Sequence, residues 1–557
     1  MTTTAHITTE SSRQNTADPA QLNTPAANLL ERATPALIFV VCLAYLCIFL
    51  RHSTLEPDEG IIIQGAERVL HGEVPYRDFF SFYTPGSFYL FSFLFSVFGD
   101  SFMVARASLA VAGAICSAVT YVLARRVCSF GISVFAAVLA TIAGVAFRFL
   151  VLHNPYSTLL ASLGLYAAVR FLETRKSGWA FAIGSLASLT FLFEQSKGAG
   201  LGVGLVLGFV LLQALGPTRF WRKHALMALG FGFAWPVVLT FGFFFAHHAV
   251  HVMVQSWLWP LQHYTQANRV PYGFQNWSDH SREMIFHTGP MWIRAVKILV
   301  VTPGLLLPAL PLIAAGMLIY WCIRLRNRPV ASSDSQYYLL TCSVLVGLLA
   351  SVAVRPDVLH FMYLAPLWYV VLAWVLGSNG TRNRTLLACR PLLTGFVIVI
   401  FGLLGMALLL AATGAHNRID TSRGTILTGE ADTVLGYLQA HVPPGGPLLV
   451  YPYLPLYNYL TATRSPSRFD YFQPGMNTPD QAQNILTSLR SNSEAPVLFE
   501  PWFPEKFANS WPGTPLAAIA NDPVANYIVQ NYRICKMLAS PEGWRFHYMV
   551  RRDRECP

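Results

Sequence analysis

The sequence predicts an all-α polytopic membrane domain of about 11 transmembrane helices, followed by a small C-terminal α/β domain. The chain of 557 residues is 54% hydrophobic and only 12% charged, whereas soluble proteins carry roughly 25% charged residues. Long apolar runs recur along residues 34–412, and a bilayer core needs about 20 apolar residues in one helix. After residue 416 short strand-like and helix-like segments alternate, which indicates the α/β domain.

The N-terminal residues 1–33 are rich in Thr, Ser and Ala and lack the basic segment of a signal peptide. We expect a disordered cytoplasmic tail there. The first apolar run then acts as an uncleaved anchor. The predicted spans are 34–50, 103–124, 130–147, 156–173, 179–194, 198–215, 224–246, 291–322, 336–354, 360–377 and 391–412.

The run 86–98 is short, and we expect a helix in the membrane interface rather than a span. With that choice every basic loop falls on one face, which the positive-inside rule assigns to the cytoplasm. The loop 51–102 and the C-terminal domain 413–557 then face the periplasm of a bacterial inner membrane. The basic loops hold Arg125 and Arg126, Arg175 and Lys176, Arg219, Arg222 and Lys223, Arg324, Arg326 and Arg328, and Arg382, Arg384 and Arg390.

The C-terminal domain is predicted from its own segments. Its residues 447–453, 495–500 and 544–552 are typical of short strands. Amphipathic helices are predicted at 429–442, 479–491 and 522–538. Cys535 and Cys556 are able to pair in an oxidising compartment. Nothing in this domain shows catalytic spacing, so we expect an accessory role.

Several classes of site are disfavoured. A net charge of +11 in a membrane protein mostly reflects cytoplasmic loops near anionic lipid, so nucleic acid is not an expected partner. The sequence has no P-loop or Rossmann glycine fingerprint. The nine cysteines show no metal spacing. His247, His248 and His251 have no acidic neighbour in sequence, so we expect no metal site there.

Carboxylates gather directly after the first predicted span. Asp58 and Glu59 open an amphipathic helix, and Asp78 follows in the same loop. We expect Asp58 at the helix N-cap, near the positive end of the helix dipole. The plain alternative is that Asp58 only caps the helix. Ionisable groups at a membrane edge are nevertheless candidates for function. A carboxylate beside apolar residues can have its pKa raised towards that of a useful base.

The stretch from Asp58 to Arg106 contains "LHGEVPYRDF" and "TPGSFYLFSFLFSVFGDSFMVAR". It resembles the membrane glycosyltransferases of the GT-C superfamily, in the branch with lipopolysaccharide-core and aminoarabinose transferases and protein mannosyltransferases. The resemblance implies a GT-C-like fold, a polyprenyl-phosphate sugar donor and direct, inverting transfer. It implies a loop acid that acts as general base or helps to bind an ion. Asp58 matches this acid, Glu59 stands beside it, and Asp78 matches a second loop acid whose spacing varies.

Such a reaction needs one carboxylate to activate the acceptor hydroxyl and cations to meet the leaving phosphate. The loop 247–290, rich in Trp, Tyr, His and Asn, suits sugar stacking and an interfacial aromatic belt equally. The candidates for binding the lipid phosphate are Lys197, Arg148, His153, Arg355 and His360. Each also suits an interfacial anchor, and Glu194 is able to neutralise Lys197.

The sequence therefore predicts an inverting hexosyl- or pentosyltransferase that moves a sugar from a polyprenyl-phosphate donor to an acceptor at the periplasmic face. Two alternatives stay open: a transporter or flippase of a lipid-linked sugar, and a protein like O-antigen polymerases or ligases. The single acidic loop and the lack of an internal repeat disfavour a transporter. The Asp58 motif disfavours a polymerase. The sugar, the prenyl length, the acceptor (lipid, glycan or protein) and a need for a divalent cation stay open.

Overall fold

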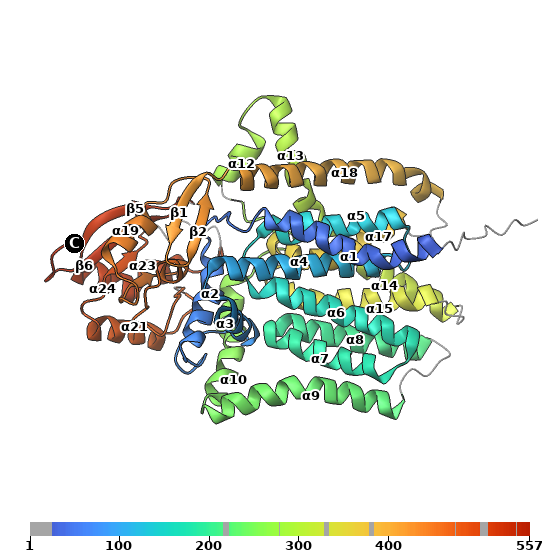
Figure 1. Cartoon of the computed structure of the whole chain (residues 1–557), viewed down its shortest axis with the longest axis horizontal. Coiled ribbons are helices and arrows are strands. Elements are labelled where there is room, and N and C mark those ends of the chain that lie inside the picture. The colour runs from blue at the N-terminus through green and yellow to red at the C-terminus, as the bar shows by residue number, and fades with distance from the viewer. Residues whose placement is uncertain are drawn as a thin grey trace, which may run out of the picture.

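The computed structural model describes residues 25–557 except 216–221, 278, 328–332, 378–383, 474, 502–510 and 542. Figure 1 shows a bundle of helices that run nearly parallel to the long axis, and a smaller unit of strands and helices at one end of it. The predicted fold class is confirmed in outline, because the helical part is followed by a small sheet region.

Seven of the described helices are long and apolar enough to cross a membrane, so the predicted count of about 11 spans is not confirmed. The helices of the bundle are α1 (Pro25–Cys47), α4 (Phe102–Ala124), α5 (Phe130–Ala140), α6 (His153–Thr174), α7 (Ser177–Phe193), α8 (Gln195–Leu215), α9 (Lys223–Ala246), α13 (Met291–Leu306), α14 (Ala309–Asn327), α15 (Ser333–Leu348), α17 (Ala365–Gly377) and α18 (Arg384–Thr413).

Two sequence expectations need correction in this part. Residues 25–33 of the predicted disordered tail are helical, because Pro25 suits a first helical turn and Ala, Leu, Glu and Arg residues favour the helix that follows. Residues 1–24 lie outside the described part of the chain. The predicted span 291–322 lies within one candidate span, Met291–Arg326, but it is not one continuous helix: α13 and α14 are separated at Leu307 and Pro308, since proline lacks the N–H that would continue a helix.

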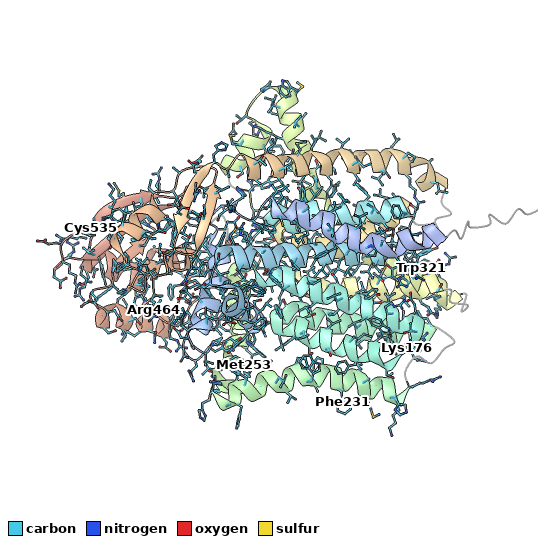
Figure 2. All side chains as sticks on the ribbon, in the orientation of Figure 1. Lys176, Phe231, Met253, Trp321, Arg464 and Cys535 are labelled. Carbon is cyan, nitrogen blue, oxygen red and sulfur yellow. A yellow bond between two sulfur atoms is a disulfide. The ribbon has the colours of Figure 1, made fainter. Side chains whose placement is uncertain are left out.

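Small residues let bundle helices approach closely. A Cβ at Gly204 of α8 would lie 2.6 Å from the Val344 Cα of α15, so only glycine fits this crossing. Apolar side chains also face outward, as Phe231 on α9 does with 70% of its surface exposed (Figure 2). Such outward residues suit a lipid surround.

The end of the bundle next to the sheet carries the shorter helices. They include the predicted helix of the first loop and the run 86–98, which is helical and lies beside α2 at this end (Figure 1). They are α2 (Pro57–Leu70), α3 (Gly86–Phe98), α10 (Val250–Trp259), α11 (Thr265–Asn268), α12 (Asp279–Phe286) and α16 (Val358–Tyr363).

The C-terminal unit begins with an antiparallel hairpin, β1 (Asn417–Thr421) and β2 (Gly424–Thr428), that the sequence pattern did not predict. A second sheet has the strand order β3-β4-β6-β5, in which β3 and β4 are parallel and the other neighbours antiparallel. Its strands are β3 (Leu449–Tyr451), β4 (Val497–Phe499), β5 (Tyr532–Ala539) and β6 (Arg545–Arg551). The helices of the unit are α19 (Val434–His441), α20 (Leu456–Thr461), α21 (Pro479–Ser491), α23 (Leu516–Ala520) and α24 (Pro523–Asn531).

The prediction of one helix in this unit is correct only for its first half. The segment 522–538 is helical as α24 up to Asn531 and then continues as strand β5, because pairing with β6 overrides the helical pattern. Cys535 of β5 and Cys556 form a disulfide, as the sequence allowed.

The first loop and the C-terminal unit share one hydrophobic core. Ile62 of α2 and Phe95 of α3 are buried in the same cluster as Leu456 and Tyr459 of α20. The backbone amide of Ser53 also donates to the Leu427 carbonyl at 2.9 Å. The C-terminal unit is therefore joined to the loop by buried apolar contacts and hydrogen bonds.

Candidate active site

Asp58 lies in the first turn of α2, which begins at Pro57. Glu56 takes the N-cap position, so the prediction that Asp58 is the N-cap was wrong; with proline at the first helical position, the helix starts two residues earlier than predicted. The carboxylate Oδ2 accepts a hydrogen bond of 2.9 Å from Nη2 of Arg148, and Oδ1 accepts one from the Tyr453 hydroxyl. Its side chain is 35% exposed, which leaves it open to a substrate.

Arg148 ends a span whose last turns are irregular. Helix α5 passes into a π-helical turn, Thr141–Val145, and then a short 3-10 turn that ends at Arg148. The guanidinium bonds both Glu56 and Asp58 and also donates to the Tyr363 hydroxyl. One half-buried cation therefore holds two carboxylates at the edge of the bundle.

The ionisation of Asp58 differs from the expectation. Burial alone would raise the pKa of Asp58, but the charge of Arg148 and the hydrogen bonds from Tyr453 and Arg148 outweigh it. Arg355 lowers it further, so the pKa lies below its ordinary value. Asp58 is thus an ionised carboxylate at neutral pH rather than a base whose pKa is raised.

Glu59 does not share this exposed position. Its side chain is fully buried and accepts two hydrogen bonds from Arg106, of 2.8 and 2.6 Å, and one of 3.0 Å from the Val151 amide. Both oxygens are occupied by partners inside the protein. Glu59 therefore anchors α2 to α4. It does not share the site of Asp58, its neighbour in sequence.

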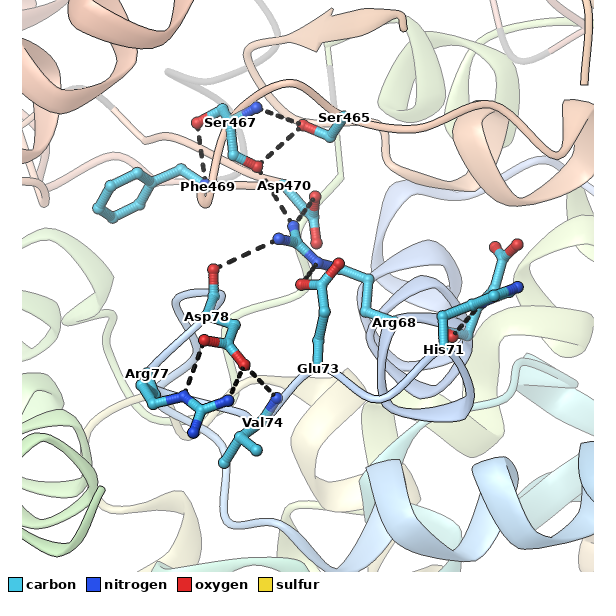
Figure 3. Close-up of polar contacts among 11 residues, drawn as sticks. Arg68, His71, Glu73, Val74, Arg77, Asp78, Ser465, Ser467, Phe469 and Asp470 are labelled. Atoms are coloured by element: carbon cyan, nitrogen blue, oxygen red, sulfur yellow. Dashed lines mark hydrogen bonds and ion pairs between the residues drawn. The ribbon is translucent and has the colours of Figure 1, made fainter. Parts of the chain in front are cut away.

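Asp78 is also separated from Asp58 by its contacts. It bonds the guanidinium of Arg77 at 2.7 and 2.8 Å and accepts from the Val74 amide at 2.7 Å. Figure 3 shows Asp78 turned towards these two residues and away from the Arg68 side chain, to which it offers only its backbone carbonyl. Asp78 closes a turn of the loop.

Arg355 and His360 belong to one hydrogen-bonded group. Asp357 accepts from Arg355 at 2.7 Å and from Nδ1 of His360 at 2.6 Å. Burial alone would raise the pKa of Asp357, but His360 and Arg355 hold it below its ordinary value, so it stays ionised. The carboxylate fixes the proton on Nδ1 of His360 and leaves Nε2 available to a ligand.

Two further residues predicted to bind the lipid phosphate make other contacts. The Lys197 ammonium is buried and bonds Glu194 at 2.8 Å as well as the hydroxyls of Ser157 and Thr158. This confirms that Glu194 neutralises Lys197. The His153 ring packs against Tyr83 at a centroid distance of 4.4 Å, and its buried Nδ1 has no hydrogen-bond partner among the described residues.

Sequence reasoning did not single out two residues of this site. Glu56 was not among the predicted site residues, yet it shares Arg148 with Asp58. Tyr453 comes from the C-terminal unit, and no motif marks it. Its partner lies 395 positions away in the chain, so only the fold brings them together. The phenols of Tyr83 and Tyr264 lie near enough for the charge of Asp58 to act on them.

The residues present do not fit a divalent cation well. Glu56 and Asp58 are the two carboxylates that meet here, and Arg148 already neutralises them. Within the described residues no group of three or more His, Cys, Asp or Glu side chains is placed to hold a metal. Hard cations such as Mg²⁺ require more oxygen ligands than this pair supplies.

Charged contacts fasten the C-terminal unit over the loop. Arg68 of α2 bonds Asp470 at 2.8 Å and Glu73 at 2.8 Å (Figure 3). Arg423, in the turn between β1 and β2, pairs with Glu67 and with Asp100. These contacts therefore hold the C-terminal unit against the last turn of the helix that carries Asp58.

Comparisons with known proteins agree with the resemblance seen in the sequence. Residues 83–241 match the family described as dolichyl-phosphate-mannose-protein mannosyltransferase. The predicted resemblance to GT-C membrane glycosyltransferases is confirmed over this part of the chain. No curated protein matches the chain.

The solved structures that are similar to the chain include the following three. The first is the archaeal oligosaccharyltransferase AglB from Archaeoglobus fulgidus with an inhibitory peptide and a dolichol-phosphate (11% identity, 95% of this chain and 75% of that chain, TM-score 0.48). The second is the Archaeoglobus fulgidus oligosaccharyltransferase with Zn and sulfate (13% identity, 92% and 72%, TM-score 0.49). The third is ArnT from Cupriavidus metallidurans bound to undecaprenyl phosphate (14% identity, 96% and 99%, TM-score 0.44).

Proposed function

We propose that this chain is an inverting glycosyltransferase, which moves one sugar from a polyprenyl-phosphate donor to an acceptor hydroxyl at the periplasmic face of a bacterial inner membrane. The observation that carries the proposal is the half-buried, ionised Asp58 beside Arg148, where the first loop meets the C-terminal unit. The description of the matched family, which names a lipid-phosphate sugar, supports the donor class.

In the proposed reaction Asp58 accepts the proton of the acceptor hydroxyl as its oxygen attacks the anomeric carbon. The bond from that carbon to the phosphate oxygen breaks on the opposite face, so the configuration inverts. Arg148, Arg355 and His360 meet the negative charge of the departing lipid phosphate. The charge of Asp58 also favours the positive character that develops at the anomeric carbon.

Two features support the proposed orientation. Figure 2 shows Lys176 at the far end of the bundle from the C-terminal unit that holds Cys535. Basic loops favour the cytoplasmic side, which sets the C-terminal unit outside. A disulfide such as Cys535–Cys556 suits an oxidising compartment.

The test is transfer of radiolabelled sugar from polyprenyl-phosphate donors by membranes that carry the protein. Asp58→Asn keeps the shape and removes the proton acceptor, so transfer should fall at least a hundredfold at equal protein level. Asp78→Asn is the matched control, because this acid bonds only loop groups among the described residues, and it should leave transfer near the wild-type rate. Full transfer by Asp58→Asn would reject the assignment, and movement of the donor across the membrane without transfer would favour a transporter.

A further inference from the structure

Tyr453 connects the C-terminal unit to the carboxylate of Asp58. It stands just beyond the end of β3, where the chain turns towards α20. Its side chain is buried, and its ring packs against Trp511 at 5.4 Å. Its hydroxyl donates to Oδ1 of Asp58, while Arg148 occupies Oδ2.

Helix α2, which carries Asp58, touches the backbone at the start of α20, three residues after Tyr453. A Cβ at Gly60, two residues after Asp58, would lie 2.2 Å from the backbone nitrogen of Leu456, the first residue of α20. Glycine therefore allows α20 to approach α2 closely. The position of Tyr453 relative to Asp58 is set by this backbone contact and not only by a flexible side chain.

The phenol can act as a permanent donor. Burial and the nearby charge of Asp58 raise the pKa of Tyr453 well above its ordinary value, so the hydroxyl keeps its proton. A donor to the ionised form of a carboxylate favours that form. The other groups that face Asp58 are Glu56, Arg148, Arg355, His153 and the phenols of Tyr83, Tyr264 and Tyr363.

We propose that Tyr453 is a positioning residue for the transfer reaction: its hydroxyl orients the Asp58 carboxylate towards the acceptor, so the C-terminal unit completes the active site. This inference rests on the proposed function. It assigns the C-terminal unit a part in the reaction in place of the accessory role expected from sequence.

The experiment compares Tyr453→Phe with Tyr451→Phe in steady-state transfer assays over a range of pH. Tyr451 is the matched control, because it is a buried phenol of the same segment whose hydroxyl bonds Asp522 inside the C-terminal unit. Tyr453→Phe should lower kcat roughly tenfold with the KM for the donor unchanged. The acid limb of its kcat/KM profile should move up by about one pH unit. Tyr451→Phe should change neither quantity.

Each outcome of these assays either supports or overturns the role proposed for Tyr453. A wild-type kcat and pH profile for Tyr453→Phe, in membranes where the wild type transfers sugar and Asp58→Asn does not, would overturn this inference alone. The same loss in both phenylalanine variants would also overturn it, because it would indicate general loosening of the C-terminal unit. If the wild type transfers no sugar from any polyprenyl-phosphate donor, the proposed function fails first and this inference fails with it.

Discussion

Replacing Gly60 with alanine tests whether the C-terminal unit must sit tightly on α2. Gly60 lies in the interior of α2, where alanine by itself would favour the helix by about 1 kcal/mol. The added methyl group, however, would lie 2.2 Å from the Leu456 nitrogen and 2.6 Å from its Cα. The obstacle is backbone, so no side-chain rotation relieves it.

The size of the displacement follows from these distances. Ordinary contact begins at 3.4 Å, so α20 has to move away from α2 by about 1.2 Å. A hydrogen bond from Tyr453 to Asp58 does not survive a shift of that size. Overpacking of this kind costs about 1–3 kcal/mol, which the gain in helix propensity partly offsets. We therefore expect a small change in stability and a large change in reaction rate.

The assay is sugar transfer at saturating donor, together with the thermal unfolding midpoint of the detergent-purified protein. Gly60→Ala should lower kcat by about 10- to 100-fold, because misplacement by about 1 Å has effects of that order. Gly436→Ala in α19 is the matched control, since a methyl group there meets nothing within 4 Å. A Gly60→Ala protein with wild-type kcat would refute the link between this contact and the reaction.

Three other perturbations test separate charges. Glu59→Gln leaves Arg106 buried without its counter-charge, so the free energy of unfolding should fall by about 3–5 kcal/mol; an unchanged unfolding midpoint would argue against the buried pair. Burial raises the pKa of Glu67 from 4.5 to about 8 despite Arg423, so the folded state binds an extra proton between these values. The stability that this extra proton provides is lost as pH rises through the folded pKa, with a slope of at most about 1.4 kcal/mol per pH unit. In unfolding scans, Glu67→Gln should therefore make the free energy of unfolding less dependent on pH over this range. Arg148→Lys keeps a charge but loses the planar fork, and it should raise the KM for the donor roughly tenfold; an unchanged KM would place the phosphate elsewhere.

The sequence was informative wherever local pattern decides structure. Apolar runs predicted most helices of the bundle, and segments 447–453 and 495–500 contain β3 and β4 as expected. The pairing of Cys535 with Cys556 was a possibility that the sequence left open, and the structure contains this disulfide. These features depend on periodicity and on residue type within a short window.

The site was only partly predictable, because its partners come from distant segments. Asp58 and Arg148 were both candidates, but their direct contact depends on the irregular end of the span that carries Arg148. Glu59 looked equivalent to Asp58 in sequence. The helix turn between adjacent residues points Glu59 into the protein against Arg106, and Asp58 to the surface. Tyr453 carries no sequence signal, since its role depends on the packing of α20 on α2.

The low pKa of Asp58 constrains the proposed reaction. A carboxylate held by Arg148 and Tyr453 is a weak base, so it cannot remove the acceptor proton before the bond to phosphate has begun to break. Bond breaking must then lead, and positive charge must build at the anomeric carbon. In that order an ionised Asp58 is useful from the start, because its charge attracts the developing cation and its basicity is needed only when the acceptor oxygen has begun to bond. The arginine that weakens Asp58 as a base is also the one proposed to meet the phosphate. In the proposed reaction, contact of Arg148 with the departing phosphate would take part of the neutralising charge from Asp58, which would make Asp58 a stronger proton acceptor at the stage when a proton has to be taken.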